Sequence, residues 1–416
     1  MVKLLIVADD FTGALDTGVQ FAAEGAVTRV VTDSDYDFRQ TGEEVQVLVL
    51  DAETRHLPPD KAYDVVIHAV HGALEAGFTY IYKKTDSALR GNIGAELSAV
   101  LDAAGADRLA FLPAFPKMNR VTRNGIHYIS GVPVAESVFG QDPFEPVRLS
   151  AVAEMIAEQS ETPVVLHSLT EAAETLPGIQ VYDAESDKDL ERIGRQLGKD
   201  GLRLSAGCAG FAAVLAEILE LNGEAPELPE LVPTFFVVCG SVNPVTLRQM
   251  QTAEEVGFPH IHLTPVQKLD PAWPESGDGQ ETIREWLELV KENGRCILDV
   301  NDPDGCTATV DYAKARGLTT EDLRVGISTQ LGRLMKQLLD GGLDATILCT
   351  GGDTLLALMR TVGVAELVPV GELATGAVLT AFTYQNILYH IISKSGGFGE
   401  PSLFCELAAL ICAGKE

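Results

Sequence analysis

Short runs of apolar residues recur along the chain, and most are followed by a glycine-punctuated segment whose hydrophobic residues have helical spacing. Alternating strands and helices are typical of parallel sheets joined by crossover helices. The first half is therefore predicted to fold as an α/β domain. Its expected strands lie within 3–9, 45–51, 78–84, 108–114, 163–168 and 179–184, with helices at 14–25 and 93–105.

A second series of the same kind begins after a segment that lacks periodicity. This segment, 223–233, is rich in proline and acidic residues, which is typical of a linker. A chain of 416 residues also exceeds the size at which one core keeps growing. We therefore expect two α/β domains with mainly parallel sheets, 1–222 and 234–416. Strands of the second are expected within 235–241, 260–265, 295–300, 345–353 and 386–397.

Composition narrows the classes of partner. The net charge of -29 repels phosphate backbones, so nucleic acid is not an expected partner. No apolar run approaches the roughly 18–20 residues that span a bilayer, and the first residues lack the long apolar core of a signal peptide. The seven cysteines form no CxxC pair, which indicates a reducing compartment and argues against a structural metal. A cytoplasmic protein is expected.

Two adjacent carboxylates, Asp9 and Asp10, end the first predicted strand, and Thr12-Gly13 then opens a helix. A carboxylate at a strand end can bind a sugar hydroxyl or accept its proton. The alternative is that Asp10 or Thr12 only caps the helix. Since side chains alternate along a strand, one aspartate can cap while the other serves a ligand.

A second cluster, Lys83-Lys84-Thr85-Asp86, follows another apolar strand and leads to Arg90. In so acidic a chain, lysines and an arginine at a strand end suit the binding of a substrate carboxylate, because charge-assisted hydrogen bonds are strong. Arg55, near a third strand end, is a further candidate anion ligand. The alternative is a solvated loop in which Asp86 or Ser87 caps a helix.

The segment 115–143 is far longer than the usual connection after a strand. Long ordered loops are usually functional, so substrate enclosure or a subunit contact is expected. His127 within it is as compatible with a structural histidine as with a catalytic one.

Three glycine-rich turns follow strands of the second half: Gly240-Ser241, Gly351-Gly352-Asp353-Thr354 and Gly396-Gly397. Glycines let the backbone approach a phosphate closely, and a following helix offers free N–H groups. Asp353 can cap its helix or reach a nucleotide-bound magnesium ion. One such turn is weak evidence because helix caps also use glycine, but three in one domain predict a nucleotide site.

Several common motifs are absent. There is no GxxxxGK[ST] phosphate loop, no GxGxxG after a strand, no HExxH and no GxSxG. These absences disfavour Walker-type NTPases, dinucleotide enzymes and the simplest hydrolases.

Six motifs in order, ADDFTGA, KKTDSALRGN, the RxTRNGxHY loop, GSVNPVT, TGGDT and KSGGFG, resemble the four-carbon acid sugar kinase family. The resemblance covers nearly the whole chain. It implies a substrate domain followed by a nucleotide domain, with the active site in the cleft between them. It also implies that Asp9, Asp10, Arg55 and Lys83 to Asp86 face the sugar acid, and that Ser241, Gly351 to Thr354 and Gly396-Gly397 face ATP. One departure is Val242-Asn243, where relatives often have small polar residues.

The expected function is ATP-dependent phosphorylation of the terminal (4-) hydroxyl of D-threonate, D-erythronate or 3-oxo-tetronate in sugar-acid catabolism, with D-threonate preferred. ATP is expected to carry Mg²⁺. Asp9, Asp10 or Asp86 would orient or deprotonate the hydroxyl, and Lys83 or Lys84 would hold the carboxylate or the developing charge. The alternatives are a kinase of another polyol acid such as glycerate, and a non-catalytic sensor of a sugar acid or nucleotide. A dehydrogenase is a weaker third, and a homodimer is the prior for the assembly.

Overall fold

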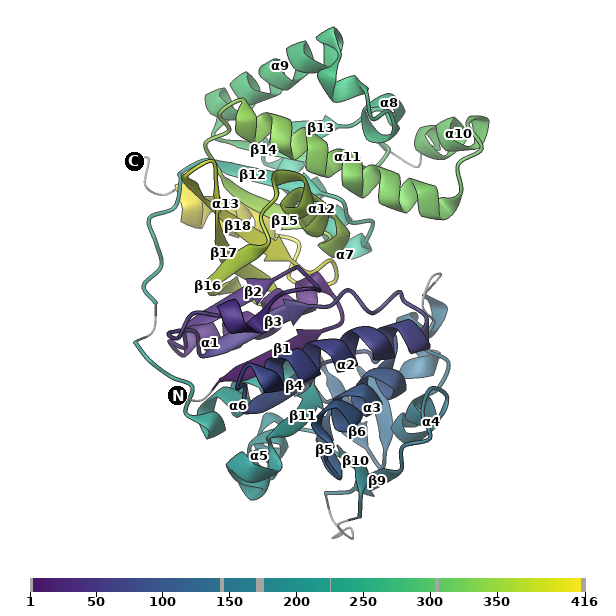
Figure 1. Cartoon of the computed structure of the whole chain (residues 1–416). Helices are drawn as coiled ribbons and strands as arrows, with labels where there is room; N and C mark the ends of the chain where they lie inside the picture. Colours follow the sequence, from purple (N-terminus) through teal and green to yellow (C-terminus); the bar gives the residue numbers. More distant parts are fainter. Residues whose placement is uncertain (1–2, 143–145, 170–175, 225, 304–306, 413–416) are drawn as a thin grey trace. The chain divides into compact units, whose positions relative to one another are not determined.

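The computed structural model describes residues 3–142, 146–169, 176–224, 226–303 and 307–412, so Pro143 of the predicted loop lies outside the described residues. The chain divides into two compact units, Met1–Pro226 and Glu227–Glu416. We call them the N-terminal and the C-terminal unit and describe each by itself (Figure 1).

The N-terminal unit contains a sheet of eight parallel strands in the order β2-β3-β1-β4-β11-β5-β10-β9. The inner strands β1 and β3 are buried along their whole length, which explains their continuous apolar sequences. The strands are β1 (Leu4–Ala8), β2 (Thr28–Val31), β3 (Val47–Asp51), β4 (Tyr80–Lys84), β5 (Arg108–Leu112), β9 (Val164–His167), β10 (Gly178–Tyr182) and β11 (Leu204–Gly207).

Helices cover both faces of this sheet, because right-handed crossovers that run in opposite directions along it lie on opposite sides. One group, in which α2 packs on α3 and α3 on α4, covers the face that carries Leu5, Val7 and Leu48. In the other group, α6 packs on both α1 and α5. The helices are α1 (Phe11–Ala23), α2 (Pro59–Glu75), α3 (Ile93–Ala104), α4 (Val152–Ala157), α5 (Asp187–Gly201) and α6 (Ala209–Leu219), with a 3-10 turn η1 (Phe38–Gln40).

The segment predicted as a long loop contains a small antiparallel sheet of β6 (Arg120–Arg123), β7 (Ile126–Ile129) and β8 (Val132–Pro133). Asn124 and Gly125 join β6 to β7 with positive φ at both positions, the backbone that a two-residue hairpin turn requires. Around it lie the 3-10 turns η2 (Pro116–Met118), η3 (Val134–Glu136) and η4 (Val138–Gln141).

The C-terminal unit has a mixed sheet in the order β13-β14-β12-β15-β18-β17-β16. The first five strands of this order, from β13 to β18, are parallel to their neighbours. Strand β17 is antiparallel to β18, and β16 is antiparallel to β17. The strands are β12 (Phe235–Cys239), β13 (His260–His262), β14 (Arg295–Asp299), β15 (Thr346–Thr350), β16 (Glu366–Ala374), β17 (Ala377–Tyr384) and β18 (Ile387–Lys394).

Helices α7 and α13 pack together over one face of this sheet, and their apolar residues form a core with those of β12. Helix α11 packs against α8, α9 and α12. The α/β class with mainly parallel sheets, predicted for both halves, is confirmed. No helix in the described parts of the chain is long and apolar enough to cross a bilayer. The helices are α7 (Pro244–Glu255), α8 (Pro265–Leu269), α9 (Gly277–Asn293), α10 (Ala308–Ala315), α11 (Thr320–Asp340), α12 (Gly352–Val362) and α13 (Leu403–Cys412), with η5 (Trp273–Glu275).

Candidate active site

Strand register brings three of the predicted clusters together at one edge of the N-terminal sheet. Ala8 at the end of β1 lies opposite Asp51 of β3 on one side and Lys84 of β4 on the other. The residues that follow these strand ends therefore share one edge. This edge is where open parallel sheets bind ligands.

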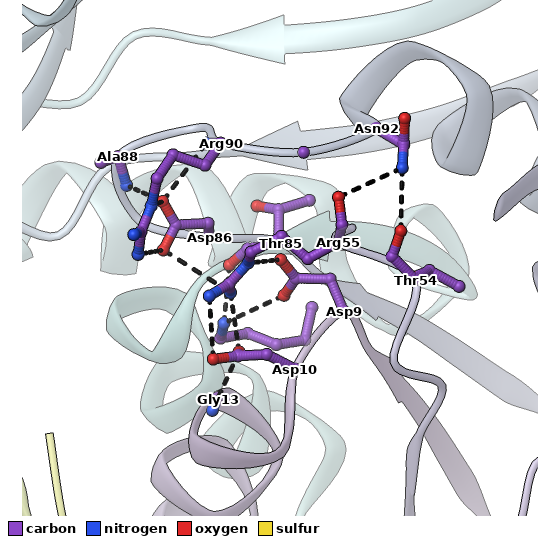
Figure 2. Close-up of polar contacts among 12 residues, drawn as sticks. Asp9, Asp10, Gly13, Thr54, Arg55, Thr85, Asp86, Ala88, Arg90 and Asn92 are labelled. Carbon is purple, nitrogen blue, oxygen red and sulfur yellow. Dashed lines mark hydrogen bonds and ion pairs between the residues drawn. The ribbon is translucent and has the colours of Figure 1, made fainter. Parts of the chain in front are cut away.

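Arg55 lies at the centre of this cluster and binds three carboxylates (Figure 2). Its Nε donates to Asp9 Oδ2 at 2.7 Å, and Nη1 and Nη2 lie 2.9 and 2.7 Å from the two carboxylate oxygens of Asp10. Nη2 is also 3.7 Å from Asp86 Oδ1. Burial opposes the charge of Arg55, but the carboxylates of Asp10, Asp9 and Asp86 raise its pKa well above the ordinary value.

Asp9 and Asp10 have different surroundings although they are neighbours. Asp9 is 2% exposed, and its Oδ1 is buried without a hydrogen bond, 3.8 Å from Lys84 Nζ. Burial raises the pKa of Asp9, but the charges of Arg55, Lys84 and Lys83 outweigh it and lower the pKa. The Asp10 side chain is 24% exposed and caps α1, accepting from Gly13 N at 3.1 Å. The structure thus assigns the cap to Asp10, which is also the more exposed of the two aspartates, so capping and exposure are not divided between them as expected.

The two lysines of β4 point in different directions, as alternation requires. Lys83 Nζ lies 3.1 Å from Glu96 Oε2 in α3 and is fully buried. Lys84 Nζ donates to Thr85 O at 2.7 Å and lies beside the first turn of α1. A Cβ at Gly13 would lie 2.6 Å from this ammonium, so only glycine lets Lys84 approach the helix this closely. Lys84, not Lys83, is the lysine next to Asp9 and Asp10.

Asp86 organises the loop after β4. Its Oδ2 accepts from Ala88 N at 3.1 Å and from Arg90 Nε at 2.9 Å (Figure 2). Burial opposes ionisation, yet the charges of Arg90 and Arg55 hold the pKa of Asp86 well below its ordinary value. Thr85 is fully buried and bonds to Gly207 O at 3.3 Å. Both oxygens of Asp86 are thus occupied by protein donors, which suits a positioning role.

Arg120, which opens β6, differs from the other cations of this edge. Its guanidinium donates to Ser87 Oγ and lies 5.1 Å from the centre of the Phe139 ring, on which Arg90 also stacks at 5.4 Å. No carboxylate of the described residues forms an ion pair with it. Burial lowers the pKa of Arg120 below its ordinary value. Arg120 is therefore a half-buried cation that forms no ion pair among the described residues, although the nearby charge of Asp86 favours its ionised form.

His127, left open between two roles, is structural in this arrangement. It is fully buried, its Nδ1 lies 3.1 Å from Thr122 Oγ1 and its Nε2 lies 3.0 Å from Ser87 O. Burial lowers its pKa to about 4, so it is neutral at physiological pH.

Strand register also aligns the three glycine-rich turns of the C-terminal unit. Cys239 of β12 lies opposite Thr350 of β15, and Thr350 lies opposite Lys394 of β18. The turns therefore lie side by side at the carboxyl edge of this sheet. A Cβ at Gly396 would lie 2.9 Å from Ser241 Oγ, and one at Gly240 would lie 1.8 Å from Thr354 Oγ1. The side chains of Ser241 and Thr354 thus occupy the space that a Cβ would need at these two turns.

The Gly351 turn leads directly into α12. Gly351 has φ +106, which non-glycine residues rarely adopt, and it occupies the N-cap position without a side-chain cap. The free N–H groups of the first turn, around Gly352, remain available to an anion. Asp353 does not cap the helix. Its exposed carboxylate forms an ion pair with Arg324 of α11.

Lys394, the last residue of β18, is 2% exposed. Its Nζ donates to Thr246 Oγ1 at 2.9 Å and to Gly396 O at 3.1 Å, and no carboxylate of the described residues pairs with it. Burial lowers its pKa to about 8. The ammonium therefore lies at the Gly396 turn with its charge uncompensated.

Comparisons with known proteins identify the family of the chain. A model of a sugar-binding N-terminal domain matches residues 4–215, and one of a nucleotide-binding C-terminal domain matches residues 236–404. A D-threonate kinase of Salmonella typhimurium is 30% identical, with 97% of each chain covered. The chain belongs to the four-carbon acid sugar kinase family. The resemblance found in the sequence motifs is thus confirmed.

Other relatives in this kinase family differ in the substrate that their names give. A D-erythronate kinase of Heliobacterium modesticaldum is 27% identical over 97% of this chain and 96% of its own. A 3-oxo-tetronate kinase of Methylobacterium radiotolerans is 25% identical over 96% of each. Overall identity therefore does not separate the three acids.

Two solved structures share the fold of this family member. A Salmonella typhimurium protein described as a tRNA synthase superposes with a TM-score of 0.78 at 20% identity, covering 98% of this chain and 99% of its own. A Haemophilus influenzae protein superposes with a TM-score of 0.72 at 21% identity, covering 98% and 100%. At such identities they establish the fold alone.

Two candidate residues of this kinase were not among the predicted site residues, namely Arg120 and Lys394. Each had a signal in the sequence. The Asn124-Gly125 pair indicates a hairpin that would carry Arg120 back to the strand ends, and Lys394 closes an otherwise apolar strand. What the sequence does not display is that neither forms an ion pair with a carboxylate of the described residues.

Proposed function

We propose that the chain is an ATP-dependent kinase that phosphorylates the terminal hydroxyl of a four-carbon sugar acid, with D-threonate as the first candidate. The observation that carries the proposal is full-length membership of a family whose matched relatives are kinases of such acids. The carboxyl edge of each sheet suits one substrate. In the N-terminal unit this edge carries a cluster of carboxylates and arginines, and in the C-terminal unit it carries the aligned glycine turns. That the reaction takes place between the two domains remains a prediction, as do a homodimer and a cytoplasmic location.

Asp10 is the proposed proton acceptor among the three aspartates. A base must touch the hydroxyl that it deprotonates, and Asp10 is the more exposed of the two aspartates that follow β1. The hydroxyl oxygen attacks the γ-phosphorus of ATP, its proton passes to Asp10, and ADP leaves. Asp9 and Asp86 would instead hold Arg55 in place, because both carboxylates are buried.

Arg55 and Lys84 are proposed to hold Asp10 and the attacking oxygen in position. Arg55 grips Asp10 through two nitrogens, which fixes the orientation of the carboxylate. Lys84 adds positive charge at the same point, where negative charge develops on the hydroxyl oxygen as its proton leaves. Thr85 and Arg90 are proposed to support this arrangement by holding the loop after β4. Lys83 is proposed to support it through its ion pair with the buried Glu96.

Arg120 is the proposed ligand of the substrate carboxylate, since the other arginines of the edge already bind protein carboxylates. We expect Arg120→Met to raise the KM for the sugar acid about 10- to 100-fold, the loss of one charge-assisted hydrogen bond or two. The KM for ATP should not change. Steady-state kinetics with each substrate varied in turn measures both.

Arg123→Met is the matched control, because Arg123 lies on the same strand but is exposed and pairs with Glu185. An Arg120→Met enzyme that keeps the KM of the parent would contradict the assignment. So would an equal loss of affinity for the uncharged polyol that lacks the carboxylate.

In the C-terminal unit, the turns at Ser241, Gly351-Gly352 and Gly396-Gly397 are proposed to bind the ATP phosphates through backbone N–H groups. Thr354 is buried against Gly240 and would fix the spacing of two of the turns. ATP enters as its magnesium complex. Asp353 is an exposed carboxylate in the first turn of α12 and the proposed side chain nearest that ion.

The activity itself is tested with a panel of acids in an assay that couples ADP formation to a readout. We expect turnover with D-threonate, D-erythronate or 3-oxo-tetronate, and little with glycerate. ATP with Mg²⁺ should also raise the melting temperature, whereas NAD should not, because a ligand stabilises only the state that binds it. Turnover of glycerate alone would replace the proposed substrate class. ATP protection without turnover of any acid would favour the sensor.

A further inference from the structure

Two histidines and a glutamate outside the proposed site lie close together in the C-terminal unit. His260 and His262 lie two residues apart on β13 and so point to the same face of this edge strand, with ring centres 3.9 Å apart. Glu254, in the last turn of α7, places its Oε2 3.3 Å from His260 Nδ1. One donor atom from each of the three lies within 4.8 Å of the others. Small side-chain rotations would bring all three to one cation.

Asp299 holds His260 in the orientation that a metal ligand needs. Asp299 ends β14, lies opposite His262 in the register and is 1% exposed. Its Oδ2 is 3.3 Å from His260 Nε2. A carboxylate at one ring nitrogen draws the proton there and leaves the other nitrogen free to bind metal. The nitrogen left for metal is Nδ1, which contacts Glu254 Oε2 in the absence of an ion.

The second histidine is oriented in the same way. His262 Nδ1 lies 3.4 Å from Asn301 O and 3.7 Å from Asp299 Oδ2. These acceptors favour a proton on Nδ1 and leave Nε2 as the basic nitrogen. The site is also open to an ion, since the side chains of Glu254 and His262 are 55% and 31% exposed.

We propose that Glu254, His260 and His262 bind one transition-metal dication, with Zn²⁺ as the reference ion. Two imidazoles and one carboxylate suit Zn²⁺, Co²⁺ or Ni²⁺, whereas Mg²⁺ prefers oxygen ligands. The site is therefore distinct from the magnesium that accompanies ATP. Three protein ligands leave a further coordination position for water or another ligand.

Metal binding is tested by titrating the full-length protein with Zn²⁺ in excess Mg²⁺, by calorimetry or chelator competition, and with Co²⁺ by visible absorption. We expect one Zn²⁺ ion to bind per protein chain. His260→Ala and His262→Ala should each weaken Zn²⁺ binding at least tenfold. Asp299→Asn should weaken it about 10- to 100-fold, as loss of an outer-shell partner does.

His71→Ala is the matched control, since His71 is an exposed histidine of α2 in the other unit. If Asp299→Asn fails to fold, His262→Ala, at a partly exposed position, keeps the test valid. The proposal is overturned if the parent protein binds no Zn²⁺ in excess Mg²⁺. It is also overturned if both histidine variants bind as tightly as the parent, which would place the ion elsewhere, for example on a cysteine. None of these outcomes depends on kinase activity.

Discussion

Replacing Asp10 by asparagine should lower kcat for the sugar acid about 10²- to 10⁴-fold, the usual contribution of a general base. The fold should survive, because asparagine caps helices as well as aspartate does and its Oδ1 can still accept from Gly13 N. Arg55 also keeps its bonds to Asp9. The expected result is a folded protein that binds the acid and ATP but turns over slowly, measured by kinetics together with calorimetry of each ligand.

Two further variants sharpen this experiment. Asp64→Asn removes an exposed carboxylate of α2 that pairs only with Lys61, and should leave activity unchanged. Asp9→Asn weakens a buried partner of Arg55 and should lower stability as well as activity. If Asp10→Asn turns over normally and Asp9→Asn is stable but inactive, Asp9 is the base and the assignment here is wrong.

Replacing Lys394 by methionine should raise the Kd for ATP about 10- to 100-fold, because a charge-assisted hydrogen bond contributes roughly 1.5–3 kcal/mol. Methionine keeps most of the apolar volume, and Thr246 Oγ1 still bonds to Gly396 O, so the turn should persist. The KM for the sugar acid should not change. Lys291→Met, an exposed lysine of α9, is the matched control.

The lowered pKa of Lys394 leads us to expect that ATP affinity depends on pH. Its pKa is lowered to about 8, so the fraction of Lys394 that carries a charge falls as pH rises through 8. ATP affinity should therefore fall between pH 7 and pH 9. In Lys394→Met this part of the pH dependence should be absent. A parent enzyme whose ATP affinity is constant over this range, or a variant that retains the fall, would contradict the role of Lys394.

Much of the fold was predictable because the inner strands are buried on both faces and read as uninterrupted apolar runs. Strand β17 was missed although residues 377–382 are buried, whereas the other missed strands lack this signal. Strand β2 has only four residues, and β16 contains Pro369 and Gly371, next to a register shift. In the small sheet of the N-terminal unit, strands of two to four residues are too short to show a period.

The candidate site was predictable to the extent that it follows strand ends. Asp9, Arg55 and Asp86 were singled out in three separate clusters because each follows a predicted strand, and register then brings them together. Which cations are already paired is a property of three-dimensional contacts between distant segments. The sequence therefore could not show that Arg55 is occupied by three carboxylates while Arg120 forms no ion pair in the part of the chain that the structure describes.

The cap at Asp10, together with its proposed role as the base, has a consequence for how such a protein can diverge. A change from an aspartate to an asparagine codon needs a single nucleotide substitution, and here it would retain the helix cap while removing the base. A descendant with that change would keep both ligand sites without consuming ATP rapidly. Gene duplication followed by this one step would thus offer a short route from a catabolic enzyme to a receptor for the same acid.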